Sequence, residues 1–327
     1  MKIVLGTLFA LFYASTVLAA SPKFAIDSHF LQSPADPGAI GDSHGDIAVA
    51  PNGDIYLSVQ GGSRSGVQVY AANGRYIRNL PNAPTDFHGF IITNAGGQSF
   101  YLLGVRLEGQ QIIKLDLDGK PLLHIDASAI PDQYKTEAKG GQLVVSLTGV
   151  AAAPNGDIYA VDGYGRDFIH HFDATGRYLG TFGGDGAPWN FHQCHKIAID
   201  PRFQPVRLLC TDRLHDRIVA MGLDGHVIGT VATGLRWPSA LAFHGSEMAV
   251  AELGGRVTVL GIHGEVLAEL GTNDNAAQVK TNEVPPSQWK DGVFYAPHGI
   301  AYDHHGNILV SEWSKWGRVD FLRRVGD

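Results

Sequence analysis

The sequence is poor in charged residues, in sulfur and in patterns that favour long helices. Charged residues make up 17% of its 327 residues, and the net charge is −7 with histidine counted as neutral. Because the sequence contains no run of lysine or arginine, we do not expect a nucleic-acid partner. Glycine is abundant at 41 residues, against 3 methionines and 2 cysteines. This composition favours many short strands joined by tight turns.

Long apolar runs are also scarce, and the one near the N-terminus is short. Lys2 is followed by an apolar stretch over residues 3–13 and then by the small residues of VLAA at 17–20. A membrane anchor, the alternative, would need about 20 apolar residues in a row. We therefore expect residues 1–20 to be a secretory signal peptide. The mature chain is then periplasmic or secreted and has no membrane span.

The two cysteines, Cys194 and Cys210, flank two neighbouring apolar runs. Cys194 precedes the run at 196–200, and Cys210 ends the run at 206–210. If these runs are antiparallel strands, the two sulfur atoms can meet. We expect a disulfide, because exported proteins fold in an oxidising compartment. Two separate buried thiols are the alternative.

One sequence pattern recurs along the chain. PNGDIY occurs at 51–56 and again at 154–159, each time between two apolar runs, and Asn-Gly in this setting is a strong hairpin signal. Six aligned copies start at 45, 88, 148, 195, 239 and 298, and each continues with a second hairpin. Repeats of about 45 residues predict a six-bladed β-propeller with four strands per blade, a single domain over 21–327. An open sandwich or two small β domains is the alternative. Polar insertions at about 129–146 and 273–296 are expected to form loops over one face.

Three of the aligned copies begin with a histidine, namely His88, His195 and His298. Blades of a six-bladed propeller stand about 60° apart, so these three residues stand about 120° apart at one end of the central channel. Three neutral imidazoles at one height suit Zn²⁺, with bonds of about 2.0–2.1 Å and an open fourth position. Other transition metals also accept imidazole, and a packing role for each histidine is the alternative. His44 lies one residue upstream of the aligned position, so we expect its side chain to point elsewhere.

Polar residues that follow the second strands should reach the same end of the channel. A tyrosine near a metal can act as a base, and an arginine can bind a carboxylate through two hydrogen bonds. We interpret Tyr164 and Arg213 as catalytic residues. The alternatives are packing for Tyr164 and an ion pair of Arg213 with Asp162 or Asp212.

Further charged residues occupy similar places in other blades. Arg64 and Arg106 follow the second strands of blades one and two, and we take them as candidates for substrate binding. Glu252 and Glu312 have comparable positions in blades five and six. Surface ion pairs are the alternative for all four.

Three segments together resemble a known family. They are NGDIYAVDGYG at 155–165, NFHQCHKIAID at 190–200 followed by TDRLHDRI, and APHGIAYDHHGNILVSEW at 296–313. They resemble the NHL-repeat propellers, which include the peptidyl-α-hydroxyglycine α-amidating lyases, over about residues 45–325. The resemblance implies a catalytic zinc held by His88, His195 and His298, with Tyr164 as base and Arg213 as the arginine that binds substrate. It also implies a structural calcium ion in the channel and cleavage of a carbinolamide into an amide and glyoxylate.

The sequence departs from this family near the substrate. Gly299 follows the third histidine where the family has aspartate, Gly165 replaces a usual cysteine, and Gln60 falls near the position of a further arginine. The metal site therefore matches the family, whereas the substrate site differs. Alternatives are a metal-dependent propeller hydrolase or lactonase, a streptogramin-type lyase, whose propeller usually has seven blades, and a non-enzymatic binding or scaffolding propeller. We expect a monomer that binds a small molecule or a peptide.

Overall fold

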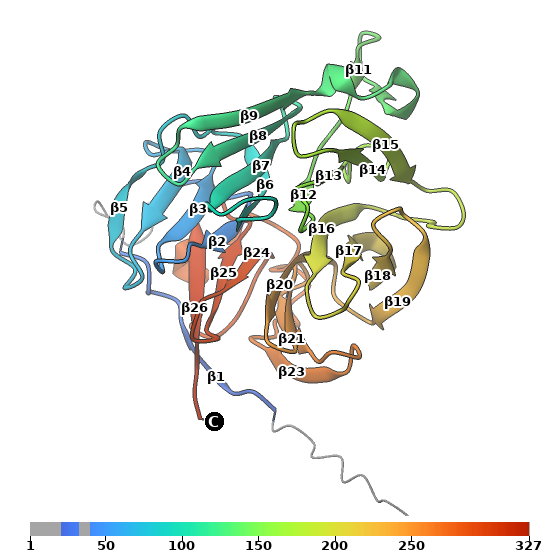
Figure 1. Ribbon diagram of the computed structural model, residues 1–327. Coiled ribbons are helices and arrows are strands. Elements are labelled where there is room, and N and C mark those ends of the chain that lie inside the picture. The colour runs from blue at the N-terminus through green and yellow to red at the C-terminus, as the bar shows by residue number, and fades with distance from the viewer. Residues whose placement is uncertain (1–20, 33–39, 327) are drawn as a thin grey trace, which may run out of the picture.

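The computed structural model describes residues 21–32 and 40–326, so the expected signal peptide lies outside the described residues. The described chain forms six four-stranded antiparallel sheets, which are the blades of a β-propeller. The innermost strands contact one another in a closed ring, in the order β2, β6, β12, β16, β20, β24 and back to β2. Figure 1 shows the blades following one another around this ring in chain order. The predicted fold is confirmed.

The strands of each blade follow one another outward from the channel. Blades one to three consist of β2 (Ile47–Val49), β3 (Ile55–Val59), β4 (Gly66–Tyr70), β5 (Tyr76–Asn79); β6 (Phe87–Thr93), β7 (Tyr101–Arg106), β8 (Gln111–Asp116), β9 (Pro121–Asp126); and β12 (Gly149–Ala152), β13 (Ile158–Val161), β14 (Phe168–Phe172), β15 (Tyr178–Gly183). Blades four to six consist of β16 (Cys194–Asp200), β17 (Arg207–Asp212), β18 (Arg217–Met221), β19 (Val227–Thr233); β20 (Pro238–His244), β21 (Glu247–Glu252), β22 (Arg256–Leu260), β23 (Val266–Leu270); and β24 (Pro297–Tyr302), β25 (Ile308–Glu312), β26 (Arg318–Arg324), β1 (Phe24–Asp27).

Blade six takes its outer strand from the beginning of the described chain. Strand β1 pairs antiparallel with β26, and Phe24 lies opposite Arg324. Figure 1 shows the two strands side by side, so the two ends of the domain close the ring together. This pairing joins distant parts of the chain, and the sequence analysis did not identify β1.

The hairpin signals of the sequence have a direct structural counterpart. Gly53 and Gly156 adopt φ values of +89° and +92°, which glycine reaches without strain. The preceding Asn52 and Asn155 side chains accept hydrogen bonds from the backbone N–H two residues later, both at 3.1 Å. In the strands that these turns join, alternate residues face opposite neighbouring blades, so both faces of each strand are buried. One such interblade core joins Val161 of blade three to Leu208 of blade four.

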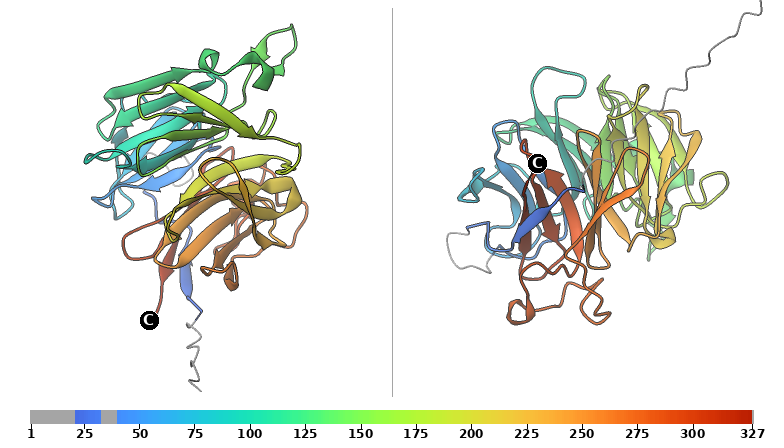
Figure 2. Two further views of the ribbon diagram at one scale, coloured as in Figure 1. Left: turned by 45° about the vertical axis from the view of Figure 1, so that its right-hand side comes forward. Right: turned by 90° about the horizontal axis from the view of Figure 1, so that it is seen from below.

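A disulfide joins Cys194 of β16 to Cys210 of β17, as predicted, and both residues are fully buried. The 3₁₀ turn η1 (Ala127–Ala129) leads into the expected insertion at 129–146, which contains the 3₁₀ turn η2 (Asp132–Tyr134) and the hairpin of β10 (Thr136–Glu137) and β11 (Leu143–Val144). This hairpin projects from the edge of the propeller (Figure 2). The second insertion contains η4 (Pro286–Gln288). Over residues 21–32 and 40–326, no helix is long and apolar enough to cross a bilayer.

Candidate metal site

The structure brings His88, His195 and His298 together at one end of the channel. They stand near the beginning of the inner strands β6, β16 and β24 and are 0–2% exposed. Their ring centroids lie 4.9 Å apart in all three pairs. Strand pairing shifts register at each of these residues, and such bulges redirect a side chain out of the regular alternation. The near-threefold arrangement predicted from alternate blades is therefore present.

The backbone of the next blade orients each of the three rings. Nδ1 of His88 lies 2.8 Å from the carbonyl oxygen of Thr148, and Nδ1 of His195 lies 2.9 Å from that of Ser239. For His298 the corresponding distance, to Gly45, is 3.4 Å. A carbonyl only accepts hydrogen bonds, so Nδ1 carries the proton and Nε2 presents its lone pair. This is the usual support of a metal-binding histidine.

Two of the three inward nitrogens are buried without a hydrogen-bond partner in the described chain. Among the described residues, Nε2 of His88 and Nε2 of His298 have no hydrogen-bond partner. Burial holds the pKa of all three imidazoles well below the usual value, and the positive charge of Arg213 lowers the pKa of His195 further. The rings are therefore neutral at neutral pH, which is the protonation state that a metal ion requires. The donor set fits a transition metal such as zinc.

A fourth histidine, His44, belongs to the same cluster, so the prediction that its side chain points elsewhere is wrong. Its ring centroid lies 4.8 Å from that of His88 and 4.9 Å from that of His298. One ring nitrogen from each of these three residues lies within 4.8 Å of the others. His44 precedes the strand β2, and the amide of Gln60 holds its carbonyl oxygen at 2.9 Å. The sequence offered one signal, since His44-Gly45 repeats the dipeptides of His88-Gly89 and His298-Gly299.

Tyr164 lies beside the histidines, in the loop after β13. Its hydroxyl oxygen is 3.1 Å from Nε2 of His195 and 3.4 Å from Nε2 of His44. Because Nδ1 of His195 is a donor to Ser239, Nε2 of His195 accepts the hydrogen bond and the Tyr164 hydroxyl donates it. The hydroxyl group of Tyr164 therefore contacts the histidine cluster directly.

Arg213 is the buried cation of the site. It lies in η3 (Arg213–His215) and is 3% exposed, and its guanidinium carbon is 6.0 Å from the centre of the Tyr164 ring. Its hydrogen bonds go to uncharged oxygens of Ser239, at 3.1 Å, and Gln193, at 3.5 Å. Burial lowers the pKa of Arg213 from its ordinary value. Within the described part of the chain this guanidinium makes no salt bridge with a carboxylate.

The two aspartates weighed as partners of Arg213 are engaged elsewhere. Asp212 accepts a hydrogen bond of 2.6 Å from Arg217 and pairs with His215 at 2.9 Å. Asp162 accepts hydrogen bonds from the backbone N–H groups of Ser146 and Arg166, and burial raises its pKa to about 7. A buried guanidinium without a carboxylate partner is costly, which makes an anionic ligand the natural complement.

Arg64 and Arg106 contact residues of their own blades. The Arg106 side chain bonds to Asp86 at 2.7 Å and to Gln111 at 2.9 Å. The Arg64 guanidinium lies over the Tyr76 ring at 5.4 Å. A role for Arg64 and Arg106 in substrate binding stays a prediction. Glu252 and Glu312 lie buried beside the arginines Arg256 and Arg318.

Directly next to the histidines, a buried ion pair crosses the channel. The Lys196 ammonium pairs with Asp46, whose carboxylate also accepts a 2.9 Å hydrogen bond from the backbone N–H of Phe90. Both residues are about 5% exposed or less. An ammonium group repels a divalent cation and neutralises the carboxylate that would bind it. This part of the channel therefore does not fit the structural calcium ion that the family resemblance implied.

The two glycines that depart from the family have no room for a side chain. A Cβ atom at Gly299 would lie 2.5 Å from Oγ of Ser311 and 2.8 Å from Cα of Asp46. A Cβ atom at Gly165 would lie 2.3 Å from both carboxylate oxygens of Asp162. The family's larger residues cannot be accommodated at these positions without rearranging the surroundings.

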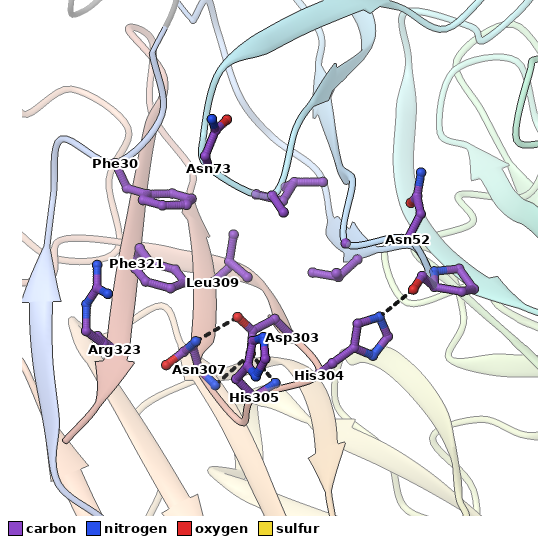
Figure 3. Close-up of a pocket in the computed structure, with 15 residues that line it drawn as sticks. Phe30, Asn52, Asn73, Asp303, His304, His305, Asn307, Leu309, Phe321 and Arg323 are labelled. Atoms are coloured by element: carbon purple, nitrogen blue, oxygen red, sulfur yellow. Dashed lines mark hydrogen bonds between the residues drawn. The ribbon is translucent and has the colours of Figure 1, made fainter. Parts of the chain in front are cut away.

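A separate pocket lies between blades one and six, away from the histidine cluster (Figure 3). It has a volume of about 580 Å³ and includes the turns at 51–53 and 303–307, at the far end of the inner strands from His298. Its polar groups bond to one another: His304 Nε2 lies 2.9 Å from the Pro51 carbonyl oxygen, and Asp303 accepts hydrogen bonds from the backbone of His305 and from the side chain of Asn307. They stabilise the turns from which they come.

The comparisons with known proteins agree on the fold. No protein-family model matches the chain, and no curated protein matches its sequence. Among solved structures, a protein of unknown function from Bacteroides thetaiotaomicron has a TM-score of 0.61 at 13% identity, over 93% of this chain and 76% of that one. A catalytically inactive histidine-to-alanine variant of virginiamycin B lyase from Staphylococcus aureus, crystallised with quinupristin, has a TM-score of 0.57 at 13% identity, over 93% and 100%. The selenomethionine form of that lyase has a TM-score of 0.55 at 14% identity, over the same shares. At these identities the likeness shows a shared fold.

Proposed function

We propose that the protein is a metal-dependent lyase whose active site lies at the histidine end of the channel. The observation that carries the proposal is the equilateral set of His88, His195 and His298, with centroids 4.9 Å apart and Nδ1 atoms fixed by backbone carbonyls. The buried Arg213 and the Tyr164 hydroxyl stand beside it. A binding or scaffolding protein has no need for this combination of ligands, cation and proton-carrying group in one place.

The metal we propose is zinc, held by His88, His195 and His298. A bound zinc ion would lower the pKa of a substrate hydroxyl group that coordinates it. The backbone carbonyls of Thr148 and Ser239 keep two of the imidazoles in the tautomer that presents Nε2. These contacts lie outside the cluster, so they hold the ligands in place before the metal arrives.

Arg213 and Tyr164 have separate roles, one in binding the substrate and the other in handling its proton. Arg213 binds a carboxylate of the substrate, because its buried charge lacks an acidic partner in the described chain and its fork of N–H groups matches a carboxylate. With a metal ion on Nε2 of His195, the Tyr164 hydroxyl would be released from the hydrogen bond that it makes to this nitrogen, and its phenolic oxygen would hold or accept the hydroxyl proton of the substrate. A substrate with a carboxylate next to the reacting carbon reaches both residues.

The proposed reaction is the cleavage of a carbinolamide of the peptidyl-α-hydroxyglycine type. The C–N bond breaks, the carbon that carried the hydroxyl becomes the aldehyde of glyoxylate, and the amide nitrogen takes up a proton. Two lines support a lyase: the resemblance of the segments around Tyr164, His195 and His298 to the amidating lyases, and the fold shared with virginiamycin B lyase. The protein is proposed to act after export, which agrees with its disulfide.

The test is an assay of the mature protein, residues 21–327, with α-hydroxyglycine peptides. Glyoxylate release that stops after chelation and returns with zinc is the expected result. A metal-dependent lyase of other substrates would bind zinc but leave these peptides intact, which would overturn the proposed substrate. No stoichiometric transition metal, together with no glyoxylate release, would overturn the lyase and favour a binding propeller.

A further inference from the structure

We propose that His44 is a fourth, exchangeable ligand of the metal ion, and that it occupies the coordination position that the substrate must take. This inference rests on the proposed metal site and concerns how that site is closed in the resting protein. A site with three histidines and an open position is typical of catalytic zinc, whereas four protein ligands are typical of a closed site. Whether His44 binds the ion determines whether the site is open or closed.

The distances place His44 beside two of the three proposed ligands, His88 and His298. A ring nitrogen of His44 lies within 4.8 Å of ring nitrogens of His88 and His298. Two ligands of one tetrahedral ion, with bonds of about 2.0–2.1 Å, have their nitrogens about 3.3 Å apart. Side-chain movements on the order of 1 Å would bring the ring nitrogens from their distance in this structure to the distance in a tetrahedral site. The path of the backbone would not need to change.

His44 is held differently from the other three histidines. His88, His195 and His298 stand in strands, with each Nδ1 directed at a backbone carbonyl of the neighbouring blade. His44 stands in the segment before β2, is less buried than the other three, and bonds through its ring to Tyr164 at 3.4 Å. Its ring can therefore leave the cluster at lower cost than the other rings.

Contacts from two blades hold the backbone of this segment over the channel. The amide of Gln60 donates a 2.9 Å hydrogen bond to the His44 carbonyl, and Ser43 forms a bridge with Ser314 through backbone hydrogen bonds of 2.9 Å in both directions. The Trp313 ring packs 5.3 Å from the His44 ring. Gln60 falls near the position where the resembling family carries an arginine. In this chain Gln60 fixes the backbone at His44.

The consequence is competition between His44 and an entering ligand. If His44 occupies the position in about nine molecules of ten, the apparent affinity for an exogenous anion falls about tenfold, because only the remaining fraction can bind it. Removing the imidazole should restore the full affinity. Tyr164, which bonds to both His44 and His195, lies where the exchange occurs.

The experiment uses the cobalt(II)-substituted mature protein at one fixed pH, with azide as the probe. Visible absorption spectra and azide titrations are compared for wild type, His44→Ala and His44→Gln. His304→Ala is the matched control, because His304 lies in a turn at the other end of blade six and bonds to the Pro51 carbonyl. We expect both His44 variants to change the cobalt spectrum and to bind azide about tenfold more tightly, while the control behaves as wild type.

Each contrary outcome has a distinct meaning. Wild type that binds no cobalt overturns the proposed metal site itself. Wild type and His44→Ala with the same spectrum and the same azide affinity leave the metal site intact and overturn the role of His44. Loss of cobalt from His44→Ala and His44→Gln, in proteins that unfold at the wild-type temperature, also overturns the proposal, because His44 would then be an obligatory ligand.

Discussion

The hydroxyl oxygen of Tyr164 lies 3.1 Å from Nε2 of His195, although the two residues belong to different blades. Nδ1 of His195 is committed to the Ser239 carbonyl, so the direction of the hydrogen bond from Tyr164 is fixed. The bond links the residue proposed to handle a proton to a residue proposed to hold the metal. Replacing Tyr164 by phenylalanine removes this hydrogen bond with the loss of one oxygen atom.

The substitution Tyr164→Phe therefore separates chemistry from metal binding. We expect kcat to fall by about 10²–10⁴-fold, the usual contribution of a general acid or base, while the zinc content stays at the wild-type value. The measurements are steady-state kinetics and metal analysis. Tyr178→Phe is the matched control, since the Tyr178 hydroxyl bonds to Thr181 in the outer strand of blade three. An unchanged kcat in Tyr164→Phe would contradict the catalytic role.

The substitution Arg213→Met tests whether the buried guanidinium serves a ligand or the fold. We expect KM for an anionic substrate to rise by about 100-fold, because a buried charge pair is lost. The melting temperature should stay the same or rise, because the variant no longer buries a charge without a carboxylate partner. Arg217→Met is the contrasting variant: it leaves the fully buried Asp212 without its 2.6 Å partner and should cost about 3 kcal/mol. A loss of stability in Arg213→Met with unchanged KM would assign Arg213 to the fold.

The ion pair of Lys196 and Asp46 gives a prediction about the channel. Lys196→Met should destabilise the protein by about 3–5 kcal/mol, because Asp46 is left buried without its cation. Adding Asp46→Asn should recover most of this loss, so the double variant is expected to be more stable than Lys196→Met alone. Denaturant unfolding of the four proteins in a double-mutant cycle measures the coupling. Additive losses, or a calcium-dependent rise in the wild-type melting temperature, would contradict this account of the channel.

The buried His170 predicts a pH dependence of stability away from the metal site. Burial lowers its pKa to about 4, from an ordinary value of 6.5. Between these values the unfolded chain binds a proton that the folded chain does not, so stability is lost as pH falls from about 6.5 to about 4. The loss is about 1.4 kcal/mol per pH unit, or about 3 kcal/mol in total. In urea unfolding with a chelator present, His170→Leu should show a shallower fall than wild type. Parallel curves would contradict the prediction.

Most of the fold could be predicted because its determinants are local. The Asn-Gly turns at Gly53 and Gly156 fix hairpins within a few residues, and six repeats of similar length leave a propeller as the consistent arrangement. Strand β1 was not predicted because no other copy of the repeat aligns with it. Its place beside β26 depends on ring closure between the two ends of the domain.

Part of the site could also be predicted, because it depends on positions that repeat along the sequence. His88, His195 and His298 open equivalent strands, so symmetry alone brings them together. His44 was misplaced because a strict alignment shifts it by one residue, whereas Gln60 and Ser314, distant in sequence, set its position in space. The carbonyl partners of the imidazoles are main-chain atoms of the next blade, and no side-chain pattern encodes them.

The central claim is that the histidine cluster binds one transition metal ion. The direct measurement is the metal content of the mature protein, purified without a histidine tag, for wild type, His195→Ala and the control His304→Ala. We expect about one zinc ion per chain in wild type and in the control, and a loss of zinc in His195→Ala, because His44 is proposed as an exchangeable ligand that does not replace a permanent one. Wild type without stoichiometric transition metal, or His195→Ala with the full wild-type content, would contradict the account.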